Sequence, residues 1–455
     1  MKKIILLISS MIIVVNIFGN GLSLNSPGPR ALALGGAFTA RADDATAIFW
    51  NPASLANQES SAKFALTDVI PFATYKTNND DFGSQTEFDI SAESELNHYF
   101  NPNLFINYVK DRLALGAGIY VPAGLGIEYP GEDLKSLTAN PDYNYPGSAE
   151  IEWSSKIGVL NFSPAVAYKI SKELSLGMAA NIYYGTFQLE RLAGVYPDQN
   201  QEVKAYQYSE DSDGIGLSAT ISMNLHPNDN LSFGLTYRLP TKVTLEGEAE
   251  NKAMEIIGLS QGMTEVSKKS DFEREVTWPS WLAFGFSYKP IDNLTLSLDA
   301  QYSKWEQVDE FVTEFEDEDW DQLTAFHDEN VFTMNWQYQT QIRFGAEYSA
   351  TSNLDLRGGY YYDPAPSPDE TLNVLFPSST NHVATGGFGY KLNKFQFDFG
   401  MEYLFGQTRD IDLSVKWYDD DGDGVPSESE YKKMNFPGEH HMDVMAFSFG
   451  VGYYF

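Results

Sequence analysis

The sequence predicts an all-β protein: a transmembrane antiparallel β-barrel of about 14 strands whose lumen is plugged by an N-terminal hatch. Apolar and polar residues alternate with period two over most of the chain, which indicates strands with one apolar face. Short polar turns alternate with long acidic segments, and a segment without alternation precedes the first strand. These three observations predict the fold class.

Composition excludes several classes of protein. The 30 basic and 63 acidic residues give the 455-residue chain a net charge of −33, which argues against nucleic-acid binding because phosphates would repel it. The chain has no cysteine, which excludes disulfides, thiolate metal sites and cysteine nucleophiles. Outside the N-terminus no run of about 18 apolar residues occurs, which excludes a bundle of membrane helices.

Residues 1–19 have the pattern of a secretory signal peptide. Lys2 and Lys3 precede an apolar stretch over residues 4–18, and small residues follow at Gly19 and Gly21. The alternative is a single membrane anchor, for which the apolar run is short. We therefore expect cleavage near Gly19.

The strands alternate strictly from about residue 60 onward. In residues 294–302, for example, Leu294, Leu298 and Tyr302 fall on one face and polar residues on the other. Six short turns alternate with seven long segments, at about residues 77–97, 123–153, 188–212, 248–274, 307–331, 364–379 and 418–440. Thirteen connections imply 14 strands, and an even strand number is typical of an outer-membrane barrel. A β-sandwich would not require long and short connections to alternate. The barrel is thus predicted over residues 60–455.

Residues 20–59 do not alternate and are predicted to form the hatch. The segment holds several glycines and the compact pair Asp43 and Asp44. A barrel of about 14 strands is too wide for its own side chains to fill, so it needs a plug.

Residues 33–56, ALGGAFTARADDATAIFWNPASLA, resemble the N-terminal hatch of the FadL/TodX (OMPP1) family of outer-membrane transporters for long-chain fatty acids and hydrophobic compounds. The resemblance includes Asn51, Pro52 and Ala53. Further matches are RLALGAGIYVPAGLGIEYPGE (112–132), LSFGLTYRLPTKVTLEGE (231–248), WPSWLAFGFSYKPIDNLTLSLDAQYSKW (278–305) and GGYYYDPAPSPDE (358–370).

The resemblance implies uptake of hydrophobic molecules through the outer membrane of a Gram-negative-type bacterium. Extracellular loops would capture a fatty acid or hydrocarbon, which would pass the hatch and leave sideways into the bilayer. The family's ligand-contacting start matches Gly21 and Leu22. An early kinked strand should provide the lateral gap, with Pro122, Gly124 or Pro164 as candidates.

Partners follow from the same interpretation. The terminal Phe455 resembles the signal that barrel-assembly machinery reads, and the wall would contact outer-membrane lipids and lipopolysaccharide. A plugged single-chain barrel needs no second copy to close, so we expect a monomer. No cofactor is required for such transport.

Two of the long segments carry residues suited to capturing an apolar ligand. Flexible methionine and leucine side chains at a surface favour promiscuous apolar binding, although they could equally pack the loops against each other. The apolar candidates are Leu189, Leu192, Tyr196, Met254, Ile257, Leu259 and Met263. Arg191 and Arg238 are available to pair with a carboxylate.

Residues 419–430 follow the spacing of a calcium-binding loop. Asp419, Asp421, Asp423 and Glu430 would supply carboxylate oxygens, and Val425 its carbonyl. The alternative is an acidic, solvated hairpin tip. Ca²⁺ would stiffen an exposed loop and take no part in transport.

Other functions remain as alternatives. An enzyme would need a Ser–His arrangement at the rim. The residues nearest to such an arrangement are Ser378, Ser379 and His382, and nothing in the sequence orients them for catalysis. A barrel that assists protein secretion or assembly, or a structural barrel, is the main alternative. An open porin is disfavoured because the hatch would block ions.

Overall fold

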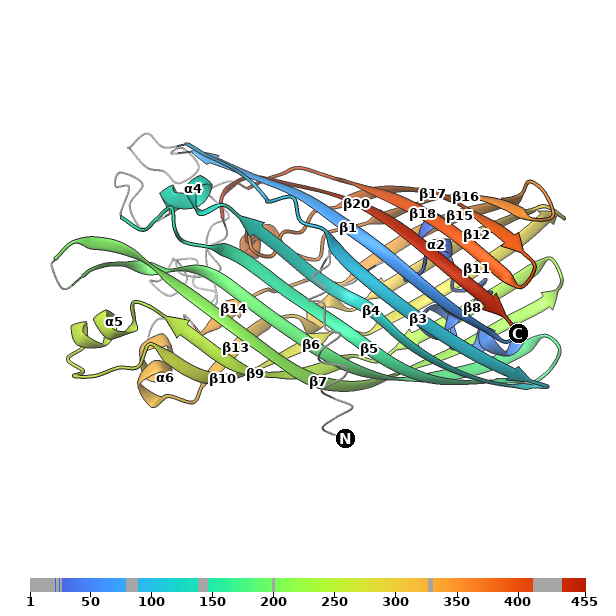
Figure 1. Cartoon of the computed structure of the whole chain (residues 1–455), viewed down its shortest axis with the longest axis horizontal. Helices are drawn as coiled ribbons and strands as arrows, with labels where there is room; N and C mark the ends of the chain where they lie inside the picture. Colours follow the sequence, from blue (N-terminus) through green and yellow to red (C-terminus); the bar gives the residue numbers. More distant parts are fainter. Residues whose placement is uncertain are drawn as a thin grey trace, which may run out of the picture.

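A computed structural model describes residues 21, 24, 27–78, 89–137, 146–198, 201–325, 330–411 and 436–455. The predicted signal peptide, Leu22 and the predicted calcium loop lie outside these residues. The model is an all-β, closed antiparallel barrel of 14 strands, which confirms the predicted fold class (Figure 1).

Several of the wall strands are interrupted and continue after a short break. In chain order they are β1 (Ser61–Asn78), β2 (Asp89–Glu93) with β3 (Tyr99–Lys110), β4 (Leu113–Tyr129), β5 (Trp153–Lys169), β6 (Leu174–Pro197), β7 (Val203–Asn228), β8 (Leu231–Arg238) with β9 (Thr241–Asn251), β10 (Lys269–Trp278) with β11 (Trp281–Ile291), β12 (Leu294–Ser303) with β13 (Glu310–Phe315), β14 (Val331–Thr333) with β15 (Gln339–Ser349), β16 (Leu354–Asp363), β17 (Asn381–Leu392), β18 (Phe395–Gly406) with β19 (Arg409–Ile411), and β20 (Gly438–Tyr454).

The first and last strands close the barrel. β1 pairs with β20 from Ser61 opposite Tyr454 to Lys76 opposite Glu439. This leaves no open edge along the seam, as hydrocarbon requires. The six tight turns lie at one end of the molecule, where Figure 1 also places the C-terminus.

The predicted alternation produces two different wall faces. Leu298, Tyr302 and Phe405 belong to a band of exposed apolar side chains around the outside. Their sequence neighbours face the lumen, as Asp299 does with 1 % and Leu404 with 2 % of its surface exposed. The outer band suits contact with lipid, so no aromatic face needs burial against a second sheet.

The hatch lies inside the barrel near the turn end, coloured blue in Figure 1. It contains α2 (Pro29–Ala33), α3 (Ala47–Trp50) and the 3₁₀ helix η1 (Pro52–Asn57). Gly35 and Gly36 follow α2 with φ of +63° and +68°, a conformation that glycine adopts without strain. The first wall strand starts directly after this segment, at Ser61.

The strands at the loop end run further than the sequence indicated. Most of the predicted loop at residues 188–212 is strand, because β6 and β7 extend over 24 and 26 residues. Inward residues such as Glu210 and Ser212 are buried there, while Asp211 and Asp213 face outward. Polar residues on both faces concealed the two-residue period of these strands. Because roughly 10 residues suffice to span the bilayer, the rest of β6 and β7 extends beyond it.

Short helices complete the loop end. They are α4 (Gly131–Leu134), η2 (Lys135–Leu137), α5 (Met254–Ser260), η3 (Trp305–Gln307), α6 (Glu318–Ala325) and η4 (Asp369–Thr371). No helix within the described ranges is long and apolar enough to cross a membrane.

Candidate functional site

The wall has a break between β3 and β4, which we call the lateral window. The pairing of these strands ends at Leu104 opposite Ile119, although both strands continue. Further up, the N–H of Glu95 donates to the carbonyl of Glu128 at 2.8 Å and closes the gap again. The window therefore lies between residues 99–103 of β3 and residues 120–127 of β4.

Prolines on both rims explain the break. Pro102 lies in β3 and Pro122 in β4, and proline has no N–H to donate to a neighbouring strand. The register of β4 against β5 shifts between Tyr120 and Ala123, and residues 120–127 are all buried instead of alternating. The upper part of β4 thus bends away from β3 while it stays paired with β5.

Pro122 was one of the predicted kink positions, and the register shift surrounds it. Pro164, another candidate, stays in the regular ladder of β5 opposite Ala117. A side chain replaces part of the missing pairing, because Oδ1 of Asn103 accepts from the N–H of Val121 at 3.3 Å.

The N-terminal segment reaches this window from the lumen side. The N–H of Leu24 donates to the carbonyl of Pro122 at 3.0 Å. Between Leu24, the top of the hatch and the wall lies a closed pocket of about 20 Å³, which has room for roughly one water molecule. Its lining is Leu24, Phe49, Trp50, Pro122, Ala123, Tyr183, Arg238, Trp278, Pro279, Trp281, Gln301 and Arg343.

Arg343 and Arg238 both give this aromatic pocket positive charge. Arg238 lies against the hatch residue Phe49. Its Nε donates to Oγ1 of Thr220 and its Nη2 to the carbonyl of Phe49, both at 3.2 Å. The guanidinium carbon lies 4.5 Å from the ring centre of Phe49 and 5.0 Å from that of Trp281. Arg238 is 3 % exposed and pairs with no carboxylate in the described part of the chain. A buried, uncompensated guanidinium suits an anionic ligand group.

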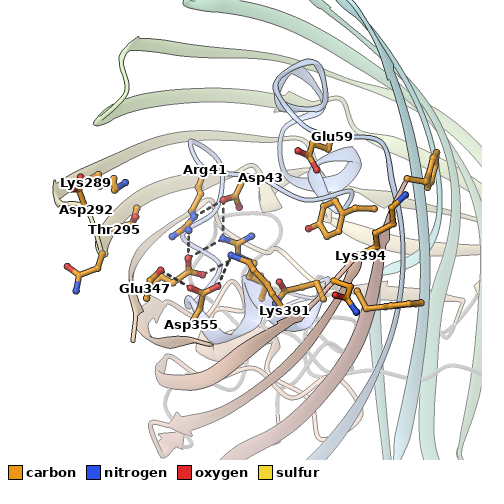
Figure 2. Close-up of a pocket in the computed structure, with 18 residues that line it drawn as sticks. Arg41, Asp43, Glu59, Lys289, Asp292, Thr295, Glu347, Asp355, Lys391 and Lys394 are labelled. Atoms are coloured by element: carbon orange, nitrogen blue, oxygen red, sulfur yellow. Dashed lines mark hydrogen bonds and ion pairs between the residues drawn. The ribbon is translucent and has the colours of Figure 1, made fainter. Parts of the chain in front are cut away.

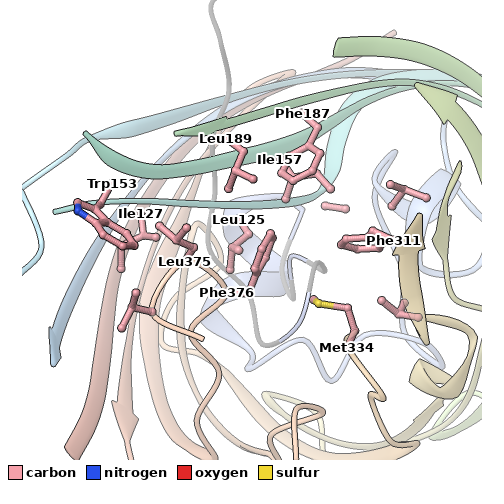
Figure 3. Close-up of a cluster of buried hydrophobic side chains, with 14 of the residues drawn as sticks. Leu125, Ile127, Trp153, Ile157, Phe187, Leu189, Phe311, Met334, Leu375 and Phe376 are labelled. Atoms are coloured by element: carbon pink, nitrogen blue, oxygen red, sulfur yellow. The ribbon is translucent and has the colours of Figure 1, made fainter. Parts of the chain in front are cut away.

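A packed cluster of buried apolar side chains, which we call the apolar vestibule, continues from the pocket toward the loop end (Figure 3). Buried side chains of β4, β5, β6 and β13 meet there with residues that follow β14 and η4. The labelled members are Leu125, Ile127, Trp153, Ile157, Phe187, Leu189, Phe311, Met334, Leu375 and Phe376. Such a surface binds apolar ligands without hydrogen-bond readout.

Several predicted ligand residues belong to this vestibule. Leu189 and Met254 are buried members of the cluster, and Leu192, Ile257 and Met263 pack against it. Leu259, by contrast, is 63 % exposed and lies outside the cluster.

The other predicted contacts lie near the rim of the lumen. The guanidinium of Arg191 lies over the ring of Tyr208 at 4.5 Å and that of Phe332 at 5.8 Å. Tyr196 is near the tip of the β6–β7 hairpin, with its ring centre 6.4 Å from that of Tyr206. The structure brings Arg191 to the vestibule and Arg238 to the pocket, so the two basic candidates occupy different levels.

Charged residues fasten the underside of the hatch to the wall. Arg30 pairs with Asp43 at 3.0 Å and with Glu347 at 3.2 Å, and Arg41 contacts the same two carboxylates. Figure 2 shows this network lining an open basin of about 740 Å³ at the turn end. Asp398 and Arg357 connect this network to Lys63, whose Nζ lies 2.5 Å from Oδ2 of Asp44.

The environment of Asp44 sets its ionisation. Burial alone would raise the pKa of this carboxyl group, but the charges of Lys63 and Arg30 and the hydrogen bonds from Lys63 and Thr46 hold the pKa below its ordinary value. Asp44 therefore stays negative and serves as a fixed anchor of the hatch.

The Asn-Pro-Ala step has a structural role in the hatch. Nδ2 of Asn51 donates to the carbonyls of Thr39 at 2.8 Å and Met223 at 3.1 Å, while its Oδ1 accepts from the N–H of Ala53. Pro52 starts η1, where its missing N–H costs nothing. The motif thus ties the hatch to itself and to β7.

Sequence reasoning missed a set of wall glycines on which the hatch rests. At each of them an added Cβ would lie less than 3 Å from an atom of the hatch. They are Gly177, Gly234, Gly285, Gly345, Gly359, Gly387, Gly400 and Gly450. Several face each other across neighbouring strands, such as Gly345 opposite Gly359 and Gly387 opposite Gly400. We call this set the glycine cradle; recurrent glycines at inward strand positions were its signal.

Two other predicted groups need comment. The calcium-loop residues Asp419, Asp421, Asp423, Val425 and Glu430 lie outside the described residues, so that site stays a prediction. Among the residues described, no group of three or more His, Asp or Glu side chains could hold a metal.

The Ser–His arrangement considered for an enzyme is not assembled. Ser378 and Ser379 are buried, while the ring nitrogens of His382 contact the hydroxyl of Tyr360 and the amide of Gln407 on the outer face.

Comparisons with known proteins agree with this geometry. Residues 18–455 match the family model described as outer membrane protein transport protein (OMPP1/FadL/TodX). Outer membrane protein P1 of Haemophilus influenzae is 24 % identical over 404 residues, covering 80 % of this chain and 81 % of the relative. The long-chain fatty acid transport protein of Escherichia coli K12 is 22 % identical over 356 residues, covering 70 % and 74 %.

Solved structures share the fold. A Pseudomonas aeruginosa FadL homologue superposes with a TM-score of 0.73 at 16 % identity, covering 96 % of this chain and all 100 % of the other. The Pseudomonas putida toluene transporter TodX gives a TM-score of 0.65 at 17 % identity, covering 96 % and 99 %.

Proposed function

The chain belongs to the OMPP1/FadL/TodX family of outer membrane transport proteins, and we propose that it takes up long-chain fatty acids and releases them sideways into the membrane. It is an outer-membrane β-barrel of a family that transports hydrophobic compounds. Curated relatives are named for long-chain fatty acids and similar structures for toluene, so the ligand class has to be argued from the residues of this chain.

The route has three parts. A ligand would enter the apolar vestibule, where Phe187, Leu189 and Phe376 offer a dry surface. It would descend to the pocket above the hatch and leave through the lateral window. The single observation that carries this route is that Pro122 and Ala123, which rim the window, also line the pocket together with Leu24.

The pocket is closed in this state, so a ligand has to displace something. Leu24 is the natural candidate, because one backbone hydrogen bond to Pro122 and a partly buried side chain hold it at the window. One backbone hydrogen bond contributes about 1 kcal/mol to stability. The burial of a few methylene groups of the ligand would offset its loss. Ligand binding would thus move the N-terminal segment and open the window at the same time.

Arg238 favours a fatty acid over a plain hydrocarbon. A hydrocarbon would leave its buried charge without a counter-ion, whereas a carboxylate would pair with it among the rings of Phe49 and Trp281. Charge-assisted hydrogen bonds of this kind contribute about 1.5–3 kcal/mol. We propose no catalytic role for any residue.

Binding measurements test this proposal. Native mass spectrometry in mild detergent should show laurate retained by the wild-type barrel and bound at least about tenfold more weakly by Arg238→Met. Arg112→Met, in the exposed turn between β3 and β4, is the matched control and should bind laurate normally. Equal laurate binding by wild type and Arg238→Met would contradict the fatty-acid assignment, and no binding of laurate or toluene by the wild type would contradict the transport function.

A further inference from the structure

A row of polar side chains crosses the inner wall between the pocket and the window. Six consecutive strands, β8 to β3, each contribute one buried polar residue to it. In that order the residues are Arg238, Thr220, Asn181, Asn161, Tyr120 and Asn103.

Hydrogen bonds connect most of the row without a gap. Oγ1 of Thr220 accepts from Nε of Arg238 at 3.2 Å and from Nδ2 of Asn181 at 3.1 Å. Nδ2 of Asn161 donates to Oδ1 of Asn181 at 3.1 Å and to the hydroxyl of Tyr120 at 2.8 Å. The hydrogen bonds therefore run from Arg238 in the pocket to Tyr120, the first residue of the bent part of β4.

Asn103 continues the row on the far rim of the window. It accepts from the N–H of Val121, the residue after Tyr120, at 3.3 Å. The row thus begins at the pocket and ends on both sides of the opening.

The row has unused hydrogen-bonding capacity. Oδ1 of Asn161 is fully buried and has no hydrogen-bond partner among the described residues, and the same is true of Oδ1 of Asn101 on the window rim. Leaving such a group unpaired is unfavourable, because folding removes its water without replacing it. These oxygens only accept, so the O–H of a protonated carboxyl head would satisfy them as it passed, whereas an ionised carboxylate would use a donor of the row such as the hydroxyl of Thr220.

Phe49 covers the row in the closed state. Its ring centre lies 5.6 Å from that of Tyr120 and 4.5 Å from the guanidinium of Arg238. Phe49 belongs to the hatch. A shift of the upper part of the hatch would therefore uncover the row where this ring contacts it.

We propose that this row is a track for the polar head of the ligand, which makes the transfer from pocket to window selective for fatty acids over hydrocarbons of equal length. The inference rests on the proposed function. The head would exchange hydrogen bonds with Thr220, Asn181, Asn161 and Asn103 while the tail stayed in the apolar lumen. A hydrocarbon can make none of these exchanges, so the track would give it no advantage.

The test compares uptake of laurate and dodecane, which share a twelve-carbon chain and differ in the head group. Cells producing equal surface amounts of folded barrel, checked by heat-modifiable electrophoretic mobility, would carry wild type or Asn161→Leu. Asn161 does not touch Arg238, so laurate binding should stay within about twofold of wild type. Laurate uptake should fall about tenfold relative to dodecane uptake, which corresponds to the loss of one hydrogen bond to a polar head.

Two further variants keep the test decisive. Thr220→Val preserves shape while removing the hydroxyl, and it should reproduce the selective loss even if Asn161→Leu folds poorly. Asn107→Leu is the control, because Asn107 is an equally buried asparagine of β3 that bonds to Ser61 and Glu59 near the turn end. Its uptake ratio should match wild type.

The possible results separate the two levels of inference. An unchanged laurate-to-dodecane ratio, including an equal loss of both, would overturn the track while leaving the transport function intact. Uptake of neither compound by the wild-type protein would overturn the proposed function itself, and the track with it.

Discussion

The ammonium of Lys63 on β1 lies 2.5 Å from Oδ2 of Asp44 in the hatch. The same ammonium lies 3.0 Å from Oδ2 of Asp398 on β18, and all three side chains are nearly inaccessible to solvent. One buried cation therefore joins the plug to two strands on either side of β20. This contact adds buried ion pairs to the apolar packing of hatch residues such as Ile48 and Leu55 against the wall.

We expect Lys63→Met to destabilise the docked hatch by about 3 kcal/mol, because it leaves the buried carboxylate of Asp44 without its ion-pair partner, while Asp398 keeps Arg357. Limited proteolysis and urea unfolding of the detergent-solubilised barrel would measure the loss. Lys76→Met is the control on the same strand, since Lys76 pairs with Glu439 at 3.5 Å in solvent and should cost less than about 1 kcal/mol. Equal effects of the two variants would contradict the anchoring role.

Acid should weaken the hatch in a way that depends on Asp44. Its pKa is lowered in the folded protein, so its contribution to stability is complete above the ordinary aspartate pKa and is lost as the pH falls through the folded value. Asp44→Asn should therefore be less stable than wild type at pH 7, and this difference should shrink toward about pH 2. Urea unfolding at both pH values measures it, and a difference independent of pH would refute the assignment.

The glycine cradle should control the seal. A Cβ on Gly177 would lie 2.3 Å from the backbone nitrogen of Ala53, so Gly177→Val should push η1 off the wall and open a leak. At Gly386 an added Cβ would meet only the carbonyl of Arg357, at 3.8 Å, and Gly386→Val should seal normally. Conductance of single barrels in planar bilayers would distinguish the two. A silent Gly177→Val barrel would show that the hatch does not depend on this contact.

Acidic side chains oppose one another on the outer face at the loop end. Glu273 on β10 is in register with Glu246 on β9 and with Glu314 on β13. Like charges directly opposite are unfavourable, so Glu273→Lys should stabilise the barrel by about 0.5 kcal/mol. Glu275→Lys is the matched control and should destabilise it, because Glu275 already pairs with Lys242 at 2.6 Å. Thermal unfolding in low salt measures both, and shifts of the same sign would contradict this explanation.

The sequence allowed the wall to be predicted because burial in a barrel repeats every second residue. Exposed Leu298 and Phe405 next to buried neighbours follow that period directly. The same rule failed over residues 188–212, where the strands leave the membrane and both faces carry polar residues. Pro122 could be recognised as a kink, but its pairing with Leu24 could not, because it joins residues without a shared pattern.

The site was predictable only in part for a similar reason. Arg238 was identified as a cation for a carboxylate, and it lines the pocket. Nothing in the local sequence linked it to Asn161 and Tyr120, since the row takes one residue from each of several strands. The glycine cradle left one signal, the recurrence of glycine at inward strand positions, but its contacts with the hatch backbone could not be predicted from that pattern.

The central claim is that the ligand leaves through the window and that the segment around Leu24 must move to let it pass. A reversible tether tests this most directly, and the natural chain has no cysteine to interfere. Leu24→Cys with Ala123→Cys joins the segment to the window rim when oxidised, and both residues line the same pocket.

Oxidation of this double variant should reduce laurate uptake to the background of cells without the barrel, and a reductant should restore it. The two single-cysteine variants should respond to neither treatment. Undiminished uptake by the fully cross-linked protein would contradict the lateral route.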